Sequence, residues 1–197
     1  RDLLDLVDDT LEIGRLDSGR STTALVEIDL RALWRELRAS CAELAPAEGV
    51  RLSWGAEPPD VAVATDVRKL ATITRNLVGN ALKFTARGSV AVELALAEAG
   101  FTLRVSDTGI GIPPEKHAEV FEMFRQLDGS DSRTYRGTGL GLYIVSRLAA
   151  ELGGSVTLAS AVGRGSTFTV TLPDRRVEGG VARPDAESAM VRSRAIA

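Results

Sequence analysis

The most informative stretch of the chain is Asn76-Leu77-Val78-Gly79-Asn80-Ala81-Leu82-Lys83-Phe84-Thr85. It falls within a segment that predicts a helix over about 67–85, capped at its start by Asp66. A helix turns by about 100° per residue, so both asparagines and the lysine lie along one edge, beside an apolar stripe that would face a sheet. Amide oxygens are hard ligands for Mg²⁺ and an ammonium neutralises phosphate, so this edge suits a phosphate and metal site. A plain solvated helix edge would show the same residues, and the stretch alone leaves both interpretations open.

A second stretch, Asp107-Thr108-Gly109-Ile110-Gly111-Ile112, follows a predicted strand. Glycines allow the backbone to approach a ligand closely. A carboxylate beside them can accept a hydrogen bond from an exocyclic amine such as that of adenine. A simple turn between a strand and a helix would use the same residues, so this stretch is also ambiguous by itself.

A third stretch, Gly137-Thr138-Gly139-Leu140-Gly141-Leu142, opens a predicted helix. Backbone N–H groups at the start of a helix bind phosphate readily when no side chain blocks them. The stretch is not a Walker loop, because no Gly-Lys-Ser/Thr follows. It is not a dinucleotide fingerprint, because it follows an irregular segment and not a buried strand.

The spacing of apolar residues predicts an α+β fold. Helices are expected over 2–17, 30–45, 67–85, 115–121 and 139–152, and strands over 24–29, 50–54, 61–64, 89–97, 100–106, 155–160 and 166–172. We expect a two-layer sandwich of a mixed, largely antiparallel sheet of about five strands with about three helices on one face, preceded by a partial coiled-coil helix. The predicted domains are an N-terminal helix over 1–20, a catalytic or binding domain over 21–173, and a tail or linker over 174–197.

Composition excludes several classes of protein. The formal net charge of −3 argues against a chain that mainly binds nucleic acid. No run of about 18 apolar residues is present, so no membrane segment is expected, and the start does not resemble a signal peptide. The single cysteine and single histidine exclude an internal disulfide and a multi-cysteine or His-rich metal site.

The order of the three stretches, with Phe121-Glu122-Met123-Phe124 between the second and the third, is much rarer than any one of them. In this order they resemble the catalytic, ATP-binding domain of a bacterial sensor histidine kinase, with the Bergerat fold of the gyrase and kinase superfamily. Residues 76–85 match the N box, 107–112 the first glycine box, 121–124 the F box and 137–142 the second glycine box. The resemblance covers about 24–173.

The resemblance implies a role for each matching residue. Asn80 would coordinate Mg²⁺, and Asn76 and Lys83 would line the phosphates of ATP as the catalytic residues. Phe84 would lie near the adenine, and Asp107 would accept its amine. The other nucleotide-binding residues would be Gly109, Gly111 and Ile112 of the first glycine box, and Gly137, Thr138, Gly139, Leu140 and Gly141 of the second.

Residues 125–138 would form a mobile lid over ATP. Gln126 stands where many relatives carry arginine, which resembles the hybrid-kinase subset and removes one candidate charge for the γ-phosphate. Arg133 or Arg136 could take its place in nucleotide binding, although a solvated loop arginine is the plainer interpretation of either.

An amide at position 76 bears on the reaction type. Hydrolytic members of the superfamily carry glutamate there, and an amide cannot accept a proton usefully at neutral pH. We therefore expect a protein-histidine kinase, in which catalysis is mainly positioning and electrostatics. A nucleotide-binding scaffold without transfer and an ATPase of the same fold are the alternatives.

The resemblance also implies partners. Residues 2–20 resemble the end of the second helix of the dimerisation and phosphoacceptor hairpin, so the acceptor histidine would lie upstream of residue 1 and the full protein would be a homodimer. A response-regulator receiver domain would take the phosphoryl group onward. The expected location is cytoplasmic, with any membrane anchor outside this chain. His117 is expected to be a surface helix residue, Cys41 a small core residue, and Trp34 and Trp54 packing residues.

Overall fold

The structure, a computed structural model, describes residues 10, 11, 13, 14, 22–124 and 138–174 of the 197-residue chain. A five-stranded sheet has the order β2 (Val50–Trp54), β4 (Gly88–Ala97), β5 (Gly100–Asp107), β7 (Gly165–Pro173), β6 (Ser155–Ala161). The β2–β4 pair is parallel and the other three pairs are antiparallel. A separate antiparallel pair joins β1 (Val26–Asp29) to β3 (Ala62–Thr65). The predicted mixed, largely antiparallel sheet is confirmed.

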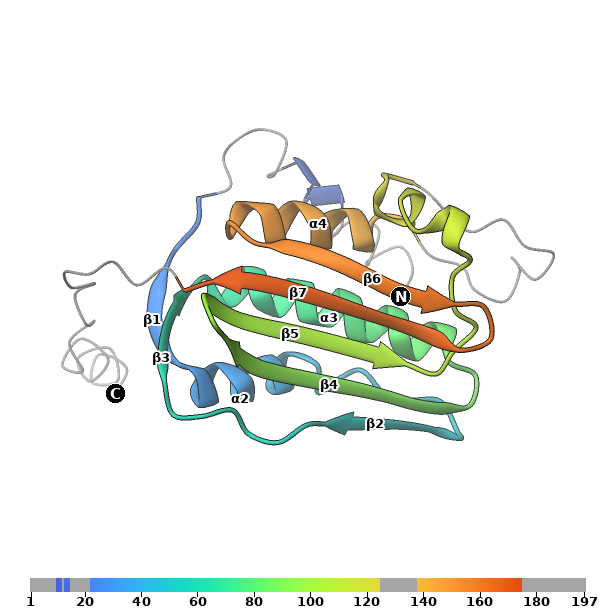
Figure 1. Ribbon diagram of the computed structural model, residues 1–197, viewed down its shortest axis with the longest axis horizontal. Helices are drawn as coiled ribbons and strands as arrows, with labels where there is room; N and C mark the ends of the chain where they lie inside the picture. Colours follow the sequence, from blue (N-terminus) through green and yellow to red (C-terminus); the bar gives the residue numbers. More distant parts are fainter. Residues whose placement is uncertain (1–9, 12, 15–21, 125–137, 175–197) are drawn as a thin grey trace, which may run out of the picture.

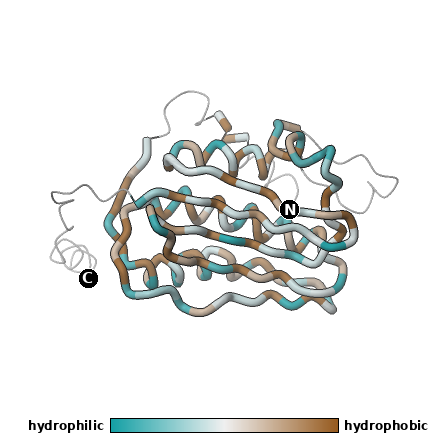
Figure 2. Tube along the Cα trace, in the orientation of Figure 1, coloured by the Kyte–Doolittle hydropathy of each residue, from teal (hydrophilic) through white to brown (hydrophobic). Residues whose placement is uncertain are grey.

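Three helices cover one face of this sheet: α2 (Leu30–Ser40), α3 (Val67–Phe84) and α4 (Gly141–Glu151) (Figure 1). Strand β4 shows why: Val90, Val92 and Leu94 are buried while Glu93 between them is exposed, so one face packs on the helices. Apolar residues recur along the strands and helices that make the two layers (Figure 2). The expected two-layer sandwich is therefore the observed architecture.

Two aspartates begin the two N-terminal helices of this layer, as predicted. Asp29 Oδ1 accepts hydrogen bonds from the backbone N–H groups of Arg31 (2.9 Å) and Ala32 (3.0 Å). Asp66 Oδ1 accepts from the second and third N–H groups of α3 at 3.1 and 3.2 Å. Such caps satisfy N–H groups that the helix itself cannot pair. They fix where α2 and α3 begin.

A partly buried polar network joins α3, α4 and the segment before β1. The ammonium of Lys69 donates to Glu151 Oε2 (2.6 Å) on α4 and to Thr23 Oγ1 (2.8 Å). Asp66 Oδ2 accepts from the N–H of Ala24 at 2.9 Å. The helix that carries the first informative stretch is thus held to the helix that carries the third.

Several predicted boundaries were wrong. The helix expected over 30–45 ends at Ser40, with Cys41 as its C-cap, because the N–H groups of Cys41 and Ala42 bond to the carbonyls three residues back, as in a turn. The helix expected over 115–121 is two 3₁₀ turns, η1 (Pro114–Lys116) and η2 (Glu119–Phe121), in a segment too short for a stable α-helix. The helix expected from 139 begins at Gly141, because Gly139 has a left-handed φ of 71°.

Little of the N-terminal segment and none of the C-terminal tail beyond Asp174 is described. Thr10, Leu11, Ile13 and Gly14 are helical, in agreement with the helix expected over 2–17, and Ile13 packs against the core. The other residues of 1–21 and the tail 175–197 lie outside the described residues. Within the described part, no helix combines the length and apolar character that a membrane span requires.

Candidate functional site

The edge of α3 that carries Asn76 and Asn80 faces the start of α4. Asn76 Nδ2 donates to the carbonyl of Thr72 (3.0 Å), one helical turn back, which fixes the orientation of this amide. A Cβ placed on Gly141 would lie 2.6 Å from Asn76 Oδ1 and 3.8 Å from Asn80 Nδ2. Only glycine allows α4 to begin this close to both amides. The first and third informative stretches are therefore in contact.

The N-terminus of α4 has the properties of an anion site. The first N–H groups of a helix lack intrahelical partners, and Leu140, the N-cap, makes no side-chain cap hydrogen bond. The hydroxyl of Thr138 accepts from the N–H of Leu140 instead, at 3.2 Å, and Leu140 itself is buried. Backbone N–H groups beside two amides suit phosphate oxygens.

The C-terminal end of α3 meets the loop after β5. The carbonyl of Phe84 accepts from the N–H of Ile110 (3.2 Å), and a Cβ on Gly109 would collide with this same carbonyl. Lys83 lies at the same end, with its Nζ 5.0 Å from the centroid of the Phe84 ring. One helix therefore touches the first glycine box at its end and the second along its side.

Asp107 is the half-buried carboxylate at the end of β5. Its Oδ1 accepts from the N–H groups of Gly109 (2.8 Å) and Ser166 (3.2 Å). Burial raises the pKa of Asp107 above its ordinary value of 3.8, and the two hydrogen bonds oppose that rise. No donor among the described residues contacts Oδ2, so the carboxylate is oriented through one oxygen. Such a carboxylate can accept a hydrogen bond from an amino group.

Sequence reasoning missed the hydroxyl of Ser160, which holds the first glycine box to the β6–β7 hairpin. Ser160 Oγ accepts from the N–H of Ile112 (2.7 Å), lies 2.8 Å from the carbonyl of Gly165, and lies 3.0 Å from Ser166 Oγ. Gly111, next to Ile112, packs so closely on the carbonyl of Ala161 that a Cβ would not fit. The one signal in the sequence that could have indicated this contact is the position of Ser166, directly after a glycine-containing hairpin turn.

The F box connects the two glycine boxes to the core. The rings of Phe121 and Phe168 on β7 make an edge-to-face contact, with centroids 6.2 Å apart. The N–H of Phe124 donates to the carbonyl of Gly139 at 3.1 Å, while its side chain is 65% exposed. This pair of contacts positions the segment that precedes α4.

The structure thus brings most of the predicted site residues into two groups along α3. One group contains Asn76, Asn80, Thr138, Gly139, Leu140 and Gly141, and the other contains Lys83, Phe84, Asp107, Gly109, Gly111 and Ile112. Gln126, Arg136 and Gly137, with the rest of the expected lid over 125–137, lie outside the described residues.

The plainer predictions have mixed outcomes. Cys41 is a core residue, only 3% exposed, and burial raises the pKa of its thiol. Trp34 is buried, and Trp54 packs against it. The expectation that His117 is a surface helix residue was wrong: it follows a 3₁₀ turn, is half-buried, and its Nε2 lies 3.0 Å from the carbonyl of Ile112.

Comparison with known proteins gives the same family from sequence and from structure. The chain is similar to the signal transduction histidine-protein kinase BarA of Escherichia coli (strain K12), at 35% identity over 173 residues, which covers 84% of this chain and 19% of that protein. It is similar to the circadian input-output histidine kinase CikA of Synechococcus elongatus, at 36% identity over 177 residues, which covers 88% of this chain and 23% of that protein. The chain therefore spans about a fifth of the length of these curated relatives.

Two solved structures share the fold. Full-length ShkA in complex with AMPPNP has a TM-score of 0.75 at 34% identity, covering 87% of this chain and 35% of that one. The mycobacterial sensor histidine kinase MprB has a TM-score of 0.62 at 25% identity, covering 78% of this chain and 100% of that one. Residues 65–176, more than half of the chain, match the family described as histidine kinase-, DNA gyrase B-, and HSP90-like ATPase. The chain belongs to this family.

Proposed function

We propose that this chain is the ATP-binding catalytic domain of a sensor histidine kinase. It transfers the γ-phosphoryl group of Mg-ATP to a histidine on a helix outside these residues, for relay to an aspartate of a response-regulator receiver domain. The observation that carries the proposal is the contact of one helix, α3, with both glycine boxes: Gly141 against Asn76, and Gly109 against Phe84. The kinase names of the relatives and the nucleotide analogue bound to ShkA support it.

The residues present fit ATP at both ends. Asp107 offers a carboxylate, oriented through Oδ1, that accepts the exocyclic amine of adenine. At the other end, the amides of Asn76 and Asn80 lie beside the start of α4, where backbone N–H groups take phosphate oxygens. Lys83 adds positive charge on the same helix. The half-buried carboxylate selects the base, and the N–H groups and ammonium hold the phosphates.

The residues also fit Mg²⁺ bound together with ATP. The ion would neutralise charge on the phosphates and is held by few protein ligands, since it keeps several waters and takes phosphate oxygens. The side-chain amide of Asn80 is the protein ligand, because its oxygen is hard and no hydrogen bond from the described residues uses it.

Asn76 distinguishes transfer from hydrolysis. Its Nδ2 donates to Thr72 and its Oδ1 lies against the start of α4, so the side chain has neither a basic group nor a free orientation for activating water. Catalysis then consists of holding the γ-phosphoryl group for an external imidazole, with charge stabilised by Lys83 and the helix N-terminus. ATP is held without rapid hydrolysis.

The same proposal covers partners and location. The upstream hairpin supplies the acceptor histidine and a homodimer interface, and the domain works in the cytoplasm whether or not other parts of the protein anchor it.

The test pairs binding with transfer. A fluorescent ATP analogue with Mg²⁺ should bind the wild-type chain, and Asn80→Ala should weaken binding at least about tenfold, because loss of a metal ligand and its charge-assisted contacts costs more than about 1.4 kcal/mol. A longer chain that includes the residues upstream of Arg1 should then become phosphorylated on histidine from labelled ATP. Steady phosphate release without any acceptor would indicate an ATPase instead. Tight binding with no transfer to the longer chain would indicate a scaffold.

A further inference from the structure

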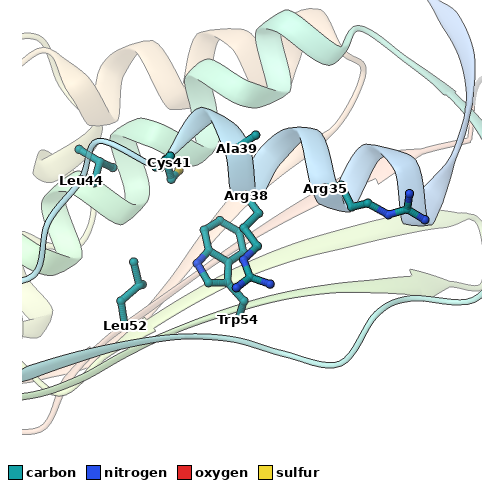
Figure 3. A pocket seen from close by; sticks show the side chains of 8 residues that line it. Arg35, Arg38, Ala39, Cys41, Leu44, Leu52 and Trp54 are labelled. Carbon is teal, nitrogen blue, oxygen red and sulfur yellow. The ribbon is translucent and has the colours of Figure 1, made fainter.

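A groove outside the nucleotide site lies between α2 and the edge strand β2 (Figure 3). Its volume is about 520 Å³, which is within the range of protein binding pockets. It is lined by Arg35, Arg38, Ala39, Cys41, Ala42, Leu44, Leu52 and Trp54. None of these residues belongs to the N box, the glycine boxes or the F box.

The floor of the groove is apolar and held in place. Trp54 packs edge-on against the buried Trp34, with ring centroids 5.1 Å apart and an interplanar angle of 71°. Leu44 and Leu52 are partly buried against the core. These three side chains therefore present a preformed apolar surface that a ligand can cover without first ordering it.

The rim of the groove is positively charged. Arg35 and Arg38 are three residues apart on α2, and both are exposed. Arg31, one turn earlier, pairs with Glu57 at 3.5 Å. Among the described residues, no ion pair involves Arg35 or Arg38. Two guanidinium groups outside any such pair, beside an apolar floor, favour a ligand that combines carboxylates with apolar groups.

The wall of the groove is a sheet edge. β2 pairs with β4 on one side, and within the described residues no strand pairs with its other side. Leu52 and Trp54 are partly buried on the helix side, while Arg51 and Ser53, which alternate with them, are exposed. A strand added along this edge would hydrogen-bond to the backbone of β2 and place every second side chain beneath α2.

We propose that this groove docks an extended, acidic segment of a partner protein, which adds to β2 as a further strand of the sheet. The inward positions of the segment carry apolar side chains against Leu52 and Trp54 and carboxylates against Arg35 and Arg38. Hydrogen bonds to the backbone of β2 give affinity. The charged rim and the apolar floor give selectivity for a segment whose inward side chains are apolar and acidic. Because the groove shares no residue with the nucleotide site, docking and nucleotide binding can be measured separately.

The probe is a fluorescein-labelled peptide, Thr-Leu-Thr-Asp-Thr-Leu-Thr-Asp, whose one face carries leucine and aspartate in turn. Its binding to the whole chain is followed by anisotropy at low ionic strength, where surface charges are least screened. The variant Arg35→Glu/Arg38→Glu should bind at least about tenfold more weakly, because attraction becomes repulsion at both rim positions. The matched variant Arg147→Glu/Arg164→Glu reverses two other exposed arginines and should bind like the wild type.

Two further peptides test the chemistry. Replacing aspartate by asparagine should weaken binding to the wild type but strengthen binding to Arg35→Glu/Arg38→Glu, because it removes the repulsion between like charges. Methylating the backbone nitrogens of the peptide should abolish binding, since strand addition needs those N–H groups. Equal binding of the aspartate and asparagine peptides, or of the two arginine variants, would overturn charge recognition. Full binding of the methylated peptide would overturn strand addition.

Two controls complete the experiment. The affinity of Arg35→Glu/Arg38→Glu for the fluorescent ATP analogue should equal that of the wild type, which shows that the variant is folded whatever the outcome of the proposed kinase assay. Sedimentation of the wild type should give a monomer at the concentrations used. A dimer that dissociates in the Arg35→Glu/Arg38→Glu variant would show that a second copy of the chain occupies the groove, and the proposal would be wrong.

Discussion

At the scale of single residues, the hydroxyl of Ser160 is a polar centre at the end of the site where we propose that adenine binds. It contacts the N–H of Ile112, the carbonyl of Gly165 and the hydroxyl of Ser166, whose own N–H donates to Asp107. Ser160→Ala would leave the N–H of Ile112 unpaired at a cost of about 1–2 kcal/mol. We expect affinity for a fluorescent ATP analogue to fall about tenfold through misplacement of the loop after β5.

A control variant on the same strand tests whether the effect is specific to the hydroxyl of Ser160. Ser155 begins β6 and is exposed, so Ser155→Ala should leave both nucleotide affinity and the unfolding temperature as in the wild type. If Ser160→Ala lowers the unfolding temperature but binds the nucleotide normally, the hydroxyl supports the hairpin and has no positioning role. Titration and thermal unfolding of the two variants decide between these outcomes.

Asp107 should show opposite effects on stability and binding. The variant Asp107→Asn keeps an oxygen that accepts from Gly109 and Ser166, but it places an NH₂ group where Oδ2 was. In the proposed complex this NH₂ group and the exocyclic amine of adenine are both donors and cannot bond to each other, so nucleotide affinity should fall at least about tenfold. Burial raises the pKa of the native carboxyl, so its ionised form destabilises the folded state at pH values above that pKa. Asp107→Asn should therefore unfold at an equal or higher temperature than the wild type at neutral pH.

The difference in stability between Asp107→Asn and the wild type should depend on pH, because burial raises the pKa of the native carboxyl. A carboxyl whose pKa is higher in the folded than in the unfolded state loses its destabilising effect as the pH falls through the folded pKa. The advantage of Asp107→Asn should therefore shrink in acid and be gone once the pH lies well below the ordinary pKa of 3.8. An advantage that grows as the pH falls would show that the native carboxyl is stabilised when ionised. Thermal unfolding of both proteins across this range measures it.

Residues within the motifs could be assigned from the sequence, and residues between them could not. Asp107 and Gly109 are two positions apart, so their contact depends only on the loop that contains both. Ser160 and Ile112 are 48 positions apart, and their contact exists only because β5 pairs with β7 and β7 with β6 in one register. Register of this kind depends on the whole sheet, which single-residue patterns do not specify.

At the scale of secondary-structure elements, two glycines on helices should respond in opposite ways to alanine. A Cβ on Gly141 would lie 2.6 Å from Asn76 Oδ1, so Gly141→Ala must push α4 away from α3 and should cost about 1–3 kcal/mol of stability. Gly79 lies within α3, and a Cβ there would meet nothing within 4 Å. Gly79→Ala should stabilise the protein by about 0.5–1 kcal/mol, because alanine restricts the unfolded chain.

Denaturant unfolding and nucleotide titration of both variants test this contact. Gly141→Ala should also bind the ATP analogue more weakly, because the amides of Asn76 and Asn80 then lie farther from the start of α4. A Gly141→Ala variant as stable and as tightly binding as the wild type would contradict the close approach of the two helices.

The starts of α2 and α3 were predicted to the residue, whereas the end of α2 was not. Asp29 and Asp66 cap their own helices, and a cap acts on the next three residues only, so the sequence contains the whole interaction. The end of α2 depends on where the chain must turn to reach β2, and apolar periodicity continues past it to Leu44, which packs against the core from a turn. The spacing of apolar residues indicates which residues are buried, and a buried residue need not belong to a helix.

At the scale of the whole molecule, the strand order was not predictable from local pattern. The sequence indicates two hairpins, and β4–β5 and β6–β7 are both present. The parallel pairing of β2 with β4 depends on the crossover through β3 and α3, and the separate β1–β3 pair depends on the placement of that crossover. These long connections leave β2 at the sheet edge, which is what creates the groove beside α2.

One contact that joins several elements of the molecule is the partly buried pair of Lys69 and Glu151. Its side chains are 9% and 24% exposed, and it links α3, α4 and, through Thr23, the segment that leads into β1. Lys69→Met removes the cation that lies 2.6 Å from Glu151 Oε2, together with the hydrogen bond to Thr23, and should cost about 3 kcal/mol. Lys69→Met/Glu151→Leu removes both charges and should recover most of that loss, because apolar side chains of similar size can replace a buried ion pair. Urea unfolding of the wild type, both single variants and the double variant gives the coupling free energy. A double variant as unstable as Lys69→Met would mean that shape, and not charge, joins the two helices that carry the nucleotide site.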